Sequence, residues 1–285
     1  ADRTTPAFDA AMSGKRFDAV VDFAAYTGRD AHGVVRALRD RTGHYVFIST
    51  GQVYLVRDQC PTPAREEHFQ GPLLAQPTDP TDLDNWRYGV DKRAAEDVFA
   101  VAFAERSFPY TTLRLPMVNG ERDHHRRLES YLWRVLDRGP VLLPDGAERP
   151  MRHVSATAVV RCIVGLLGNP ATHGQAFNLA QDETPSLPAL VALLGEIVGT
   201  RPPVVPVPTA ALRDAGLDPV AVSPFSDRWM SFLDPARAKG ELGFVHEPVR
   251  AYVDRFVACM LSSPPADRPA GYLRRPEEIR LASNR

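Results

Sequence analysis

Two short apolar runs on either side of one amphipathic segment constrain the fold of this 285-residue chain most strongly. Residues 17–25 form an apolar run that ends in small side chains, and residues 45–49 form a second run followed by Thr-Gly. Between them, residues 31–42 carry apolar side chains at helical spacing, and Gly43 supplies a stop signal. Neither run alternates with polar residues, which is typical of strands buried on both faces of a parallel sheet. Strand, helix and strand within about 30 residues predict a βαβ unit with a right-handed crossover.

Helical and strand patterns continue to alternate along the rest of the chain. A loop rich in Pro, Asp, Thr and Gln over 55–84 precedes a strongly helical stretch over 85–106 and an apolar strand over 110–115. Further helices are predicted over 127–138, 155–168, 186–198 and 247–262, and short strands over 141–143 and 175–179. Strands that alternate with helices predict the α/β class, with a parallel sheet covered by helices on both faces.

Charge and cysteine content narrow the possible partners. The chain has 34 basic and 35 acidic residues and a net charge of -1, which gives no reason to expect binding to nucleic acid or to an anionic membrane. No apolar run reaches the ~18 residues of a membrane helix, and the N-terminus lacks a signal-peptide core. The cysteines, Cys60, Cys162 and Cys259, stand too far apart to suggest zinc or a disulfide framework. We therefore expect a cytoplasmic protein without a nucleic-acid or membrane partner.

The most informative pair of polar side chains is Tyr88 and Lys92. Their spacing of four residues places both on one face of the predicted helix. A cation near a phenol favours the phenolate, so we expect the Tyr88 pKa to fall from its ordinary value of ~10 toward neutrality. Such a tyrosine can exchange a proton with a substrate hydroxyl or carbonyl. The alternative is that Tyr and Lys share this helix face by chance.

Thr50 adds a hydroxyl in a suitable place. It follows a buried strand, so it lies at the carboxyl end of a parallel strand, the edge where open α/β sheets bind ligands. A Thr at this position also commonly bonds a loop amide. Lys92 is one of only three lysines among the 34 basic residues, with Lys15 and Lys239. Its compact ammonium suits ribose hydroxyls better than a guanidinium does.

These segments resemble the extended short-chain dehydrogenase/reductases, the NAD(P)-dependent sugar epimerases and dehydratases. The sequence is similar to the atypical branch related to chloroplast stem-loop-binding proteins. The matching segments keep the family's order along the chain and lie at 18–25, 45–54, 88–92, 113–120, 149–154, 177–180 and 234–244. The resemblance implies a Rossmann-like doubly wound parallel sheet with a smaller α/β substrate lobe, and NAD or NADP as the cofactor.

The resemblance also implies roles for individual residues. Tyr88 would be the general acid and base, Lys92 would bind the nicotinamide ribose and tune Tyr88, and Thr50 would bond the reacting oxygen. The cofactor would be bordered by Ala24, Ala25, Tyr88, Lys92, Pro116 and Val118. The substrate, a small molecule of the nucleotide-sugar kind, would contact Gln52 and Arg149, the latter through an anionic group. An exposed Arg149 with no ligand is the alternative, because Arg152 lies one turn away.

Domain boundaries follow from the same likeness. We expect a Rossmann-like core over 1–120 and 155–180, a substrate lobe over 121–154 and 181–262, and a loosely packed tail over 263–285. The family often forms dimers through helices that include the one carrying the Tyr-Lys pair, so we expect a homodimer.

The sequence departs from the family in several places. It contains no Gly-x-x-Gly-x-x-Gly after a leading strand, and its first residues look like the end of the third strand. The missing part corresponds to roughly 60 residues, two crossover units, which normally bind the pyrophosphate and read the adenine ribose. Leu55 also stands where Gly is usual, and Ser155 or Ala156 where an Asp is frequent. A truncated, cofactor-free binding or scaffold protein is therefore the alternative function, and the sequence given being part of a longer polypeptide is a third possibility.

Other groupings predict little. His124 and His125, with Asp123 and Glu129 nearby, do not predict a metal site, because adjacent histidines point in different directions and neighbouring arginines repel a cation. A hydrolase triad around Ser49 lacks the nucleophile-elbow context. We expect no metal.

Overall fold

The computed structural model describes residues 1–145 and 150–284. Within it the chain divides into two compact units. The first contains Ala1–Met117, Thr157–Ala180 and Trp229–Val245. The second contains Val118–Ala156, Gln181–Arg228 and His246–Arg285. Each unit is described by itself.

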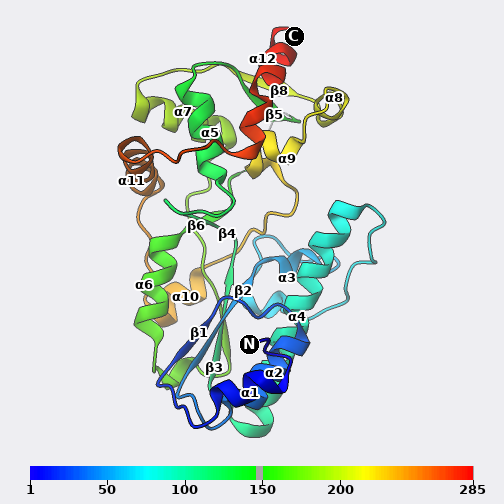
Figure 1. Cartoon of the computed structure of the whole chain (residues 1–285), viewed down its shortest axis with the longest axis vertical. Coiled ribbons are helices and arrows are strands. Elements are labelled where there is room, and N and C mark those ends of the chain that lie inside the picture. Colours follow the sequence, from blue (N-terminus) through cyan, green and yellow to red (C-terminus); the bar gives the residue numbers. More distant parts are fainter. Residues whose placement is uncertain (146–149, 285) are drawn as a thin grey trace. The chain divides into compact units, whose positions relative to one another are not determined.

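A parallel four-stranded sheet forms the centre of the first unit (Figure 1). Its strands, in spatial order, are β1 (Val20–Asp22), β2 (Tyr45–Thr50), β3 (Tyr110–Leu115) and β7 (Gln175–Asn178). β2 and β3 are paired along their whole length, from Tyr45 opposite Tyr110 to Thr50 opposite Leu115. The predicted α/β class and parallel sheet are confirmed.

Helices cover both faces of this sheet. α2 (Gly28–Leu38) and α4 (Pro80–Arg106) pack together on one face, and α6 (Ala156–Leu166) and α10 (Ala236–Leu242) lie on the other (Figure 1). The remaining helices of this unit are short: α1 (Pro6–Met12), α3 (Gln52–Leu55), η1 (Glu66–Phe69) and η2 (Pro170–Thr172). Between the sheet and the α2–α4 pair lies an apolar core rich in aromatic rings, in which the Phe99 ring lies 5.1 Å from Tyr45 and 5.0 Å from Phe47.

Local capping explains where the two main helices begin. α2 begins at Gly28 because Thr27 and Asp30 form a capping box that satisfies the first free amides. α4 begins at Pro80, earlier than predicted, because the Asp79 side chain accepts a hydrogen bond from the Asp82 amide and Pro80 suits the first turn. The predicted loop over 55–84 is therefore shorter than expected.

The second unit combines two small sheets with helices. β4 (Met117–Asn119) pairs with β6 (His153–Ser155), and β5 (Val141–Pro144) pairs in parallel with β8 (Val204–Val207). Its helices are α5 (Arg127–Leu136), α7 (Leu187–Val198), α8 (Thr209–Asp214), α9 (Pro219–Val222), α11 (Val249–Ser262) and α12 (Arg275–Ser283), with short η3 (Pro224–Ser226) and η4 (Ala270–Arg274).

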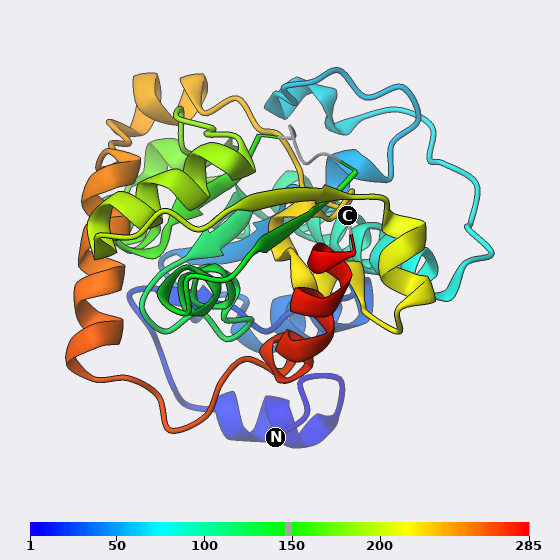
Figure 2. The same cartoon turned by 90° about the horizontal axis from the view of Figure 1, so that it is seen from above.

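The C-terminal segment differs from its prediction as a loosely packed tail. Helix α12 lies beside α5 in both views (Figure 1 and Figure 2). Arg134 of α5 donates hydrogen bonds to Glu278 of α12, and neither side chain is exposed to solvent. Arg275 bonds both Glu278 and Asp137. The expectation of loose packing is wrong because α12 is bound to Arg134 and Asp137, which lie more than a hundred positions earlier in the chain.

The division into units also places residues 229–245 differently from the sequence-based boundaries, which assigned them to the substrate lobe. In the structure they join the first unit. The Ala64 amide donates to the Phe232 carbonyl, the Asp234 amide donates to the Ala64 carbonyl, and α10 packs near β7. These contacts tie the segment to the sheet.

Candidate active site

A phenol and a hydroxyl meet at the carboxyl edge of the parallel sheet. Thr50 is the last residue of β2, and the Gly51 amide that follows donates to the Leu115 carbonyl at 2.7 Å. Tyr88 projects from α4, and the Thr50 side chain lies near enough to its phenol to favour the phenolate. The Thr50 hydroxyl itself accepts a hydrogen bond from the Gln52 amide at 3.2 Å. The strand end and the helix thus bring two groups that are 38 positions apart in the sequence near each other.

Lys92 lies one helical turn further along α4 and is only 2% exposed. Its Nζ donates to the main-chain carbonyl of Ala25 at 2.7 Å and to that of Ile48 at 2.9 Å. The same Nζ lies 4.7 Å from the centroids of the Tyr26 and Phe47 rings, a distance at which a cation is attracted to an aromatic face.

Tyr26 connects the two α4 side chains. Its ring centroid lies 6.1 Å from that of Tyr88, and the same ring contacts the Lys92 ammonium. Tyr26 is 50% exposed, so this cluster of aromatic rings around a buried cation reaches the surface of the unit. Tyr88, Lys92 and Thr50, the three residues predicted to act together, are therefore gathered at one end of the sheet.

The electrostatics of the pair differ from the prediction. Burial raises the pKa of Tyr88 above its ordinary value, and the nearby Thr50 side chain only partly offsets this. Burial lowers the pKa of Lys92 to about 8, opposed by the negative charges of Asp22 and Glu96. The expected acidic phenol is wrong for this state, because the ammonium is bound to carbonyls and Tyr88 is buried. At neutral pH Tyr88 is a neutral phenol, which can donate a proton to an oxygen acceptor.

The residues predicted to border a cofactor fall into two groups. Ala24 and Ala25 follow β1; both main-chain amides donate to the Asp22 carboxylate, at 2.7 and 3.0 Å, and Ala24 is exposed. Pro116 is buried directly after β3, whose last residue pairs with Thr50. Val118 belongs to β4 in the second unit, whereas Tyr88 belongs to the first.

The two predicted substrate contacts have different outcomes. Gln52 is 8% exposed, and its amide nitrogen donates to Asn85 at the main-chain carbonyl (3.2 Å) and at Oδ1 (2.9 Å). It lies two residues after Thr50, near the site but engaged with α4. Arg149 lies outside the described residues.

Sequence reasoning missed Asp22 and Tyr26 as members of this site. Asp22 is a charged residue inside an otherwise apolar strand run, and that conflict was the available signal. Tyr26 carries no comparable signal, because only the fold brings its ring to Lys92. β1 is also shorter than predicted and ends at Asp22, whose carboxylate turns the chain by binding the next amides.

A buried polar network holds α4 against the sheet behind the site. Glu96 accepts hydrogen bonds from Arg114 of β3 at 2.6 Å and from Ser49 of β2 at 2.6 Å. Arg114 also donates to the Tyr54 hydroxyl at 2.6 Å, which in turn donates to Asn178 of β7 at 2.9 Å. Arginine and glutamate are each 5% exposed. The network joins α4 to four neighbouring elements, β2, β3, α3 and β7, one turn beyond Lys92.

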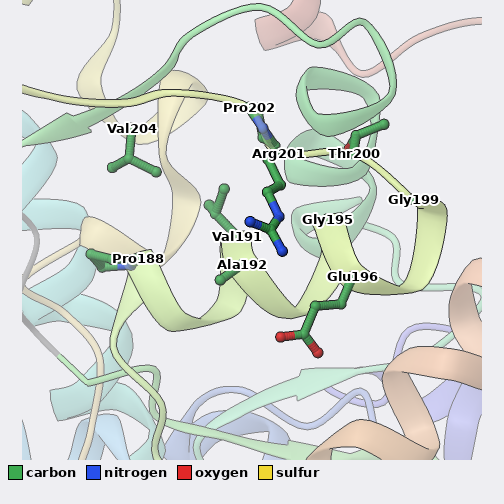
Figure 3. A pocket seen from close by; sticks show the side chains of 10 residues that line it. All are labelled: Pro188, Val191, Ala192, Gly195, Glu196, Gly199, Thr200, Arg201, Pro202 and Val204. Atoms are coloured by element: carbon green, nitrogen blue, oxygen red, sulfur yellow. The ribbon is translucent and has the colours of Figure 1, made fainter.

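Other features of the described residues are poorer candidates for chemistry. A groove of about 820 Å³ in the second unit lies between α7 and the segment after it, with the Arg201 side chain over the helix (Figure 3). Its carboxylate, Glu196, is paired with Arg250. No group of three or more metal-ligating side chains occurs in the part of the chain that the structure describes. Within those same residues no helix is long and apolar enough to cross a membrane.

A doubly wound parallel sheet, with a helix that carries Tyr and Lys four residues apart at its carboxyl edge, defines a short-chain dehydrogenase/reductase type of fold. The chain belongs to the NAD dependent epimerase/dehydratase family, whose family model matches residues 2–180. The predicted family, and with it the class of nicotinamide-dependent enzyme, is confirmed. No curated protein matches the chain.

Solved structures of the same fold are similar at low sequence identity. UDP-glucose 4-epimerase from Thermotoga maritima is 18% identical with a TM-score of 0.70, and the match covers 93% of this chain and 84% of that one. The dTDP-glucose 4,6-dehydratase from Bacillus anthracis, in complex with NAD, is 13% identical with a TM-score of 0.67, over 92% and 79% of the two chains. RMD from Pseudomonas aeruginosa, complexed with NADPH, is 17% identical with a TM-score of 0.67, over 92% and 87%.

Proposed function

We propose that this protein is an NAD(P)-dependent epimerase, dehydratase or reductase that acts on a hydroxyl or carbonyl group of a nucleotide sugar. The observation that carries the proposal is the cluster at the sheet edge, in which the Tyr26 ring contacts both the Tyr88 ring and the buried Lys92 ammonium, next to the strand that ends in Thr50. Similar structures that act on UDP-glucose and dTDP-glucose support the substrate class.

The residues at this edge fit the nicotinamide half of the cofactor. Lys92 is a buried cation with donor capacity suited to ribose hydroxyls, and the exposed Ala24 presents a small side chain beside it. When bound, the cofactor supplies hydride exchange at a carbinol carbon. Ala24, Ala25, Lys92 and Pro116 are the residues of this unit that would hold it.

The chain's own contribution is proton transfer. Tyr88 is protonated at neutral pH, so it donates to a substrate carbonyl oxygen in the reductive direction and accepts the proton back in the oxidative one. Thr50 holds the same oxygen through its hydroxyl. Lys92, held by the carbonyls of Ala25 and Ile48, would bind the nicotinamide ribose rather than acidify Tyr88.

The substitution Tyr88→Phe tests this role. It removes the transferable proton and retains the ring, so we expect turnover to fall by about 100-fold or more, with the thermal unfolding midpoint nearly unchanged. The matched control is Tyr110→Phe, the same substitution at the opposite end of the sheet, where turnover should persist. Equal turnover in wild type and Tyr88→Phe would exclude the proton-transfer role.

Calorimetric titration with NAD(H) and NADP(H) separates this function from the alternative. Binding of either cofactor, weakened by Lys92→Met, supports the enzyme. A folded protein that binds neither would favour a cofactor-free binding or scaffold protein.

We also propose a homodimer that uses the α2–α4 face. A shallow groove of about 270 Å³ runs between these helices. Its lining combines apolar and charged side chains: His32, Val35, Arg36, Arg39, Val98, Val101, Ala102, Glu105 and Arg106. Val101 is 54% exposed there. An apolar centre rimmed by charges of both signs suits a self-complementary contact.

A further inference from the structure

Both carboxylate oxygens of Asp22, at the end of β1, accept hydrogen bonds. Oδ1 accepts the amides of Ala24 at 2.7 Å and Ala25 at 3.0 Å. Oδ2 accepts the Tyr45 hydroxyl at 2.6 Å and the Arg3 guanidinium at 2.5 Å. A carboxylate that accepts four hydrogen bonds is held rigidly, since a hydrogen bond to a charged acceptor is stronger than a hydrogen bond between neutral groups. These bonds hold the main chain just after β1 in one conformation.

This backbone conformation places a main-chain carbonyl within hydrogen-bond distance of Lys92. Ala25, whose amide is bound to Asp22, presents its own carbonyl to the Lys92 ammonium at 2.7 Å. The second carbonyl, from Ile48, comes from the neighbouring strand β2 and is independent of Asp22. Two neutral carbonyls hold a buried cation, and the carboxylates that act on it do so through space.

The charged groups that act on the ammonium are Asp22, Glu96, Asp30 and Arg3, whereas β2 faces it with a carbonyl and the Phe47 ring. Glu96 of α4 is neutralised by Arg114, and Asp30 of α2 is engaged in capping that helix. Asp22 of β1 is the strongest of the groups that favour the charged lysine, whereas Arg3 opposes it. The Tyr26 and Phe47 rings complete its surroundings.

We propose that Asp22 is a positioning residue for Lys92: its carboxylate fixes the Ala24–Ala25 turn that holds the ammonium, and its charge keeps that buried lysine protonated. The role of this positioning in catalysis rests on the proposed function. The contact between the turn and Lys92 is independent of that function.

The small number of lysines makes a direct test practical. With lysine labelled by ¹³C at Cε, the full-length protein gives signals from Lys15, Lys92 and Lys239 only, and loss of one signal in Lys92→Arg assigns the buried group. In wild type, the Lys92 midpoint should lie well below the ordinary value of a lysine, because burial lowers its pKa to about 8. In Asp22→Asn, an isosteric change, we expect its midpoint to move down by about one pH unit.

Two further variants make the result decisive. Asp91→Asn removes one negative charge from an exposed position on the same helix and should leave the midpoint unchanged. Arg3→Gln removes the opposing cation and should move the midpoint up. Opposite signs in Asp22→Asn and Arg3→Gln cannot arise from general loosening. A Lys92 midpoint that stays constant in folded Asp22→Asn overturns the proposal, as does an equal shift in Asp91→Asn.

Turnover provides the link to function. If the proposed enzyme is active, the basic limb of its pH–kcat profile should shift in Asp22→Asn in the same direction as the Lys92 signal. If no variant shows activity and the Lys92 signal shifts as expected, the positioning role holds and the proposed reaction fails. The two outcomes are therefore distinguishable.

Discussion

Lys92 shows how a single residue can be placed by spacing and yet be governed by its surroundings. The four-residue interval from Tyr88 correctly indicated that both side chains share a helix face and reach the same end of the sheet. It did not indicate that two main-chain carbonyls take the ammonium. One carbonyl comes from the turn after β1 and the other from β2, so no pattern within α4 contains them.

A second residue, His44, should make the free energy of unfolding decrease as the pH falls. It is fully buried, and its Nδ1 accepts the Gly168 amide at 3.0 Å, so Nε2 carries the proton and donates to Thr111 at 2.8 Å. Burial lowers the His44 pKa to about 4, and the nearby His173 adds to this. The neutral ring is the one that fits, because protonation would place a hydrogen on Nδ1 against the Gly168 amide.

The sign of the pH dependence follows. The unfolded chain takes up this proton near pH ~6.5, before the folded protein does, so the contribution of His44 to the free energy of unfolding is constant above that pH. It should fall by roughly 3 kcal/mol between pH 6.5 and 4 from His44 alone. Urea unfolding at several pH values measures this. In His44→Gln the decrease should be smaller by that amount, and an unaltered pH dependence in this variant would contradict the assignment.

At the scale of elements, α4 is the piece on which the site depends. The helix carries Tyr88, Lys92 and Glu96 at four-residue intervals, so one face meets Thr50, the strand-end carbonyls and Arg114 in turn. Its end at Arg106 was predicted, and Ser107 closes the helix there in the left-handed conformation, whereas its start at Pro80 lies before the predicted start at residue 85. Its attachment to the sheet was not predictable, because Arg114 could equally have been an exposed strand residue.

Removing one partner of the buried Glu96–Arg114 ion pair should destabilise the fold. In Glu96→Ala the Arg114 charge stays buried without its carboxylate, and we expect the free energy of unfolding to fall by about 3–5 kcal/mol. The exposed Asp91→Ala on the same helix should change it by less than about 0.5 kcal/mol. Denaturant titration compares them. The double variant Glu96→Ala/Arg114→Met should lose less than the single one, and a greater loss would argue against a charge effect.

At the scale of the whole molecule, the family match and the fold agree over the first unit. The family model ends at residue 180, and the sheet of that unit ends with β7 at Asn178. Residues 229–245 return to the same unit from outside the matched range. The α2–α4 face belongs entirely to this first unit, which makes it a surface that can be tested without reference to the second.

The proposed dimer leads to a simple comparison. Val101→Glu places a charge in the apolar centre of the α2–α4 groove, so we expect it to shift the protein from dimer to monomer in sedimentation velocity. Val160→Glu is the matched control, because Val160 is 55% exposed on α6, on the other face of the sheet. A monomeric wild type, or dissociation by Val160→Glu alone, would contradict this interface.

The sequence by itself determined the alternation of strands and helices, the parallel sheet, the family and the gathering of Tyr88, Lys92 and Thr50 at one edge. The alternation, the sheet and the placement of the site residues follow from periodicity and spacing, which act over one or two turns or along one strand, whereas the family followed from the resemblance of several motifs. Only the tertiary structure decided the protonation of Tyr88, the carbonyl binding of Lys92, the membership of Asp22 and Tyr26, and the burial of the C-terminal helix. Each of these depends on desolvation and on partners distant in the chain, and a local pattern carries no record of either.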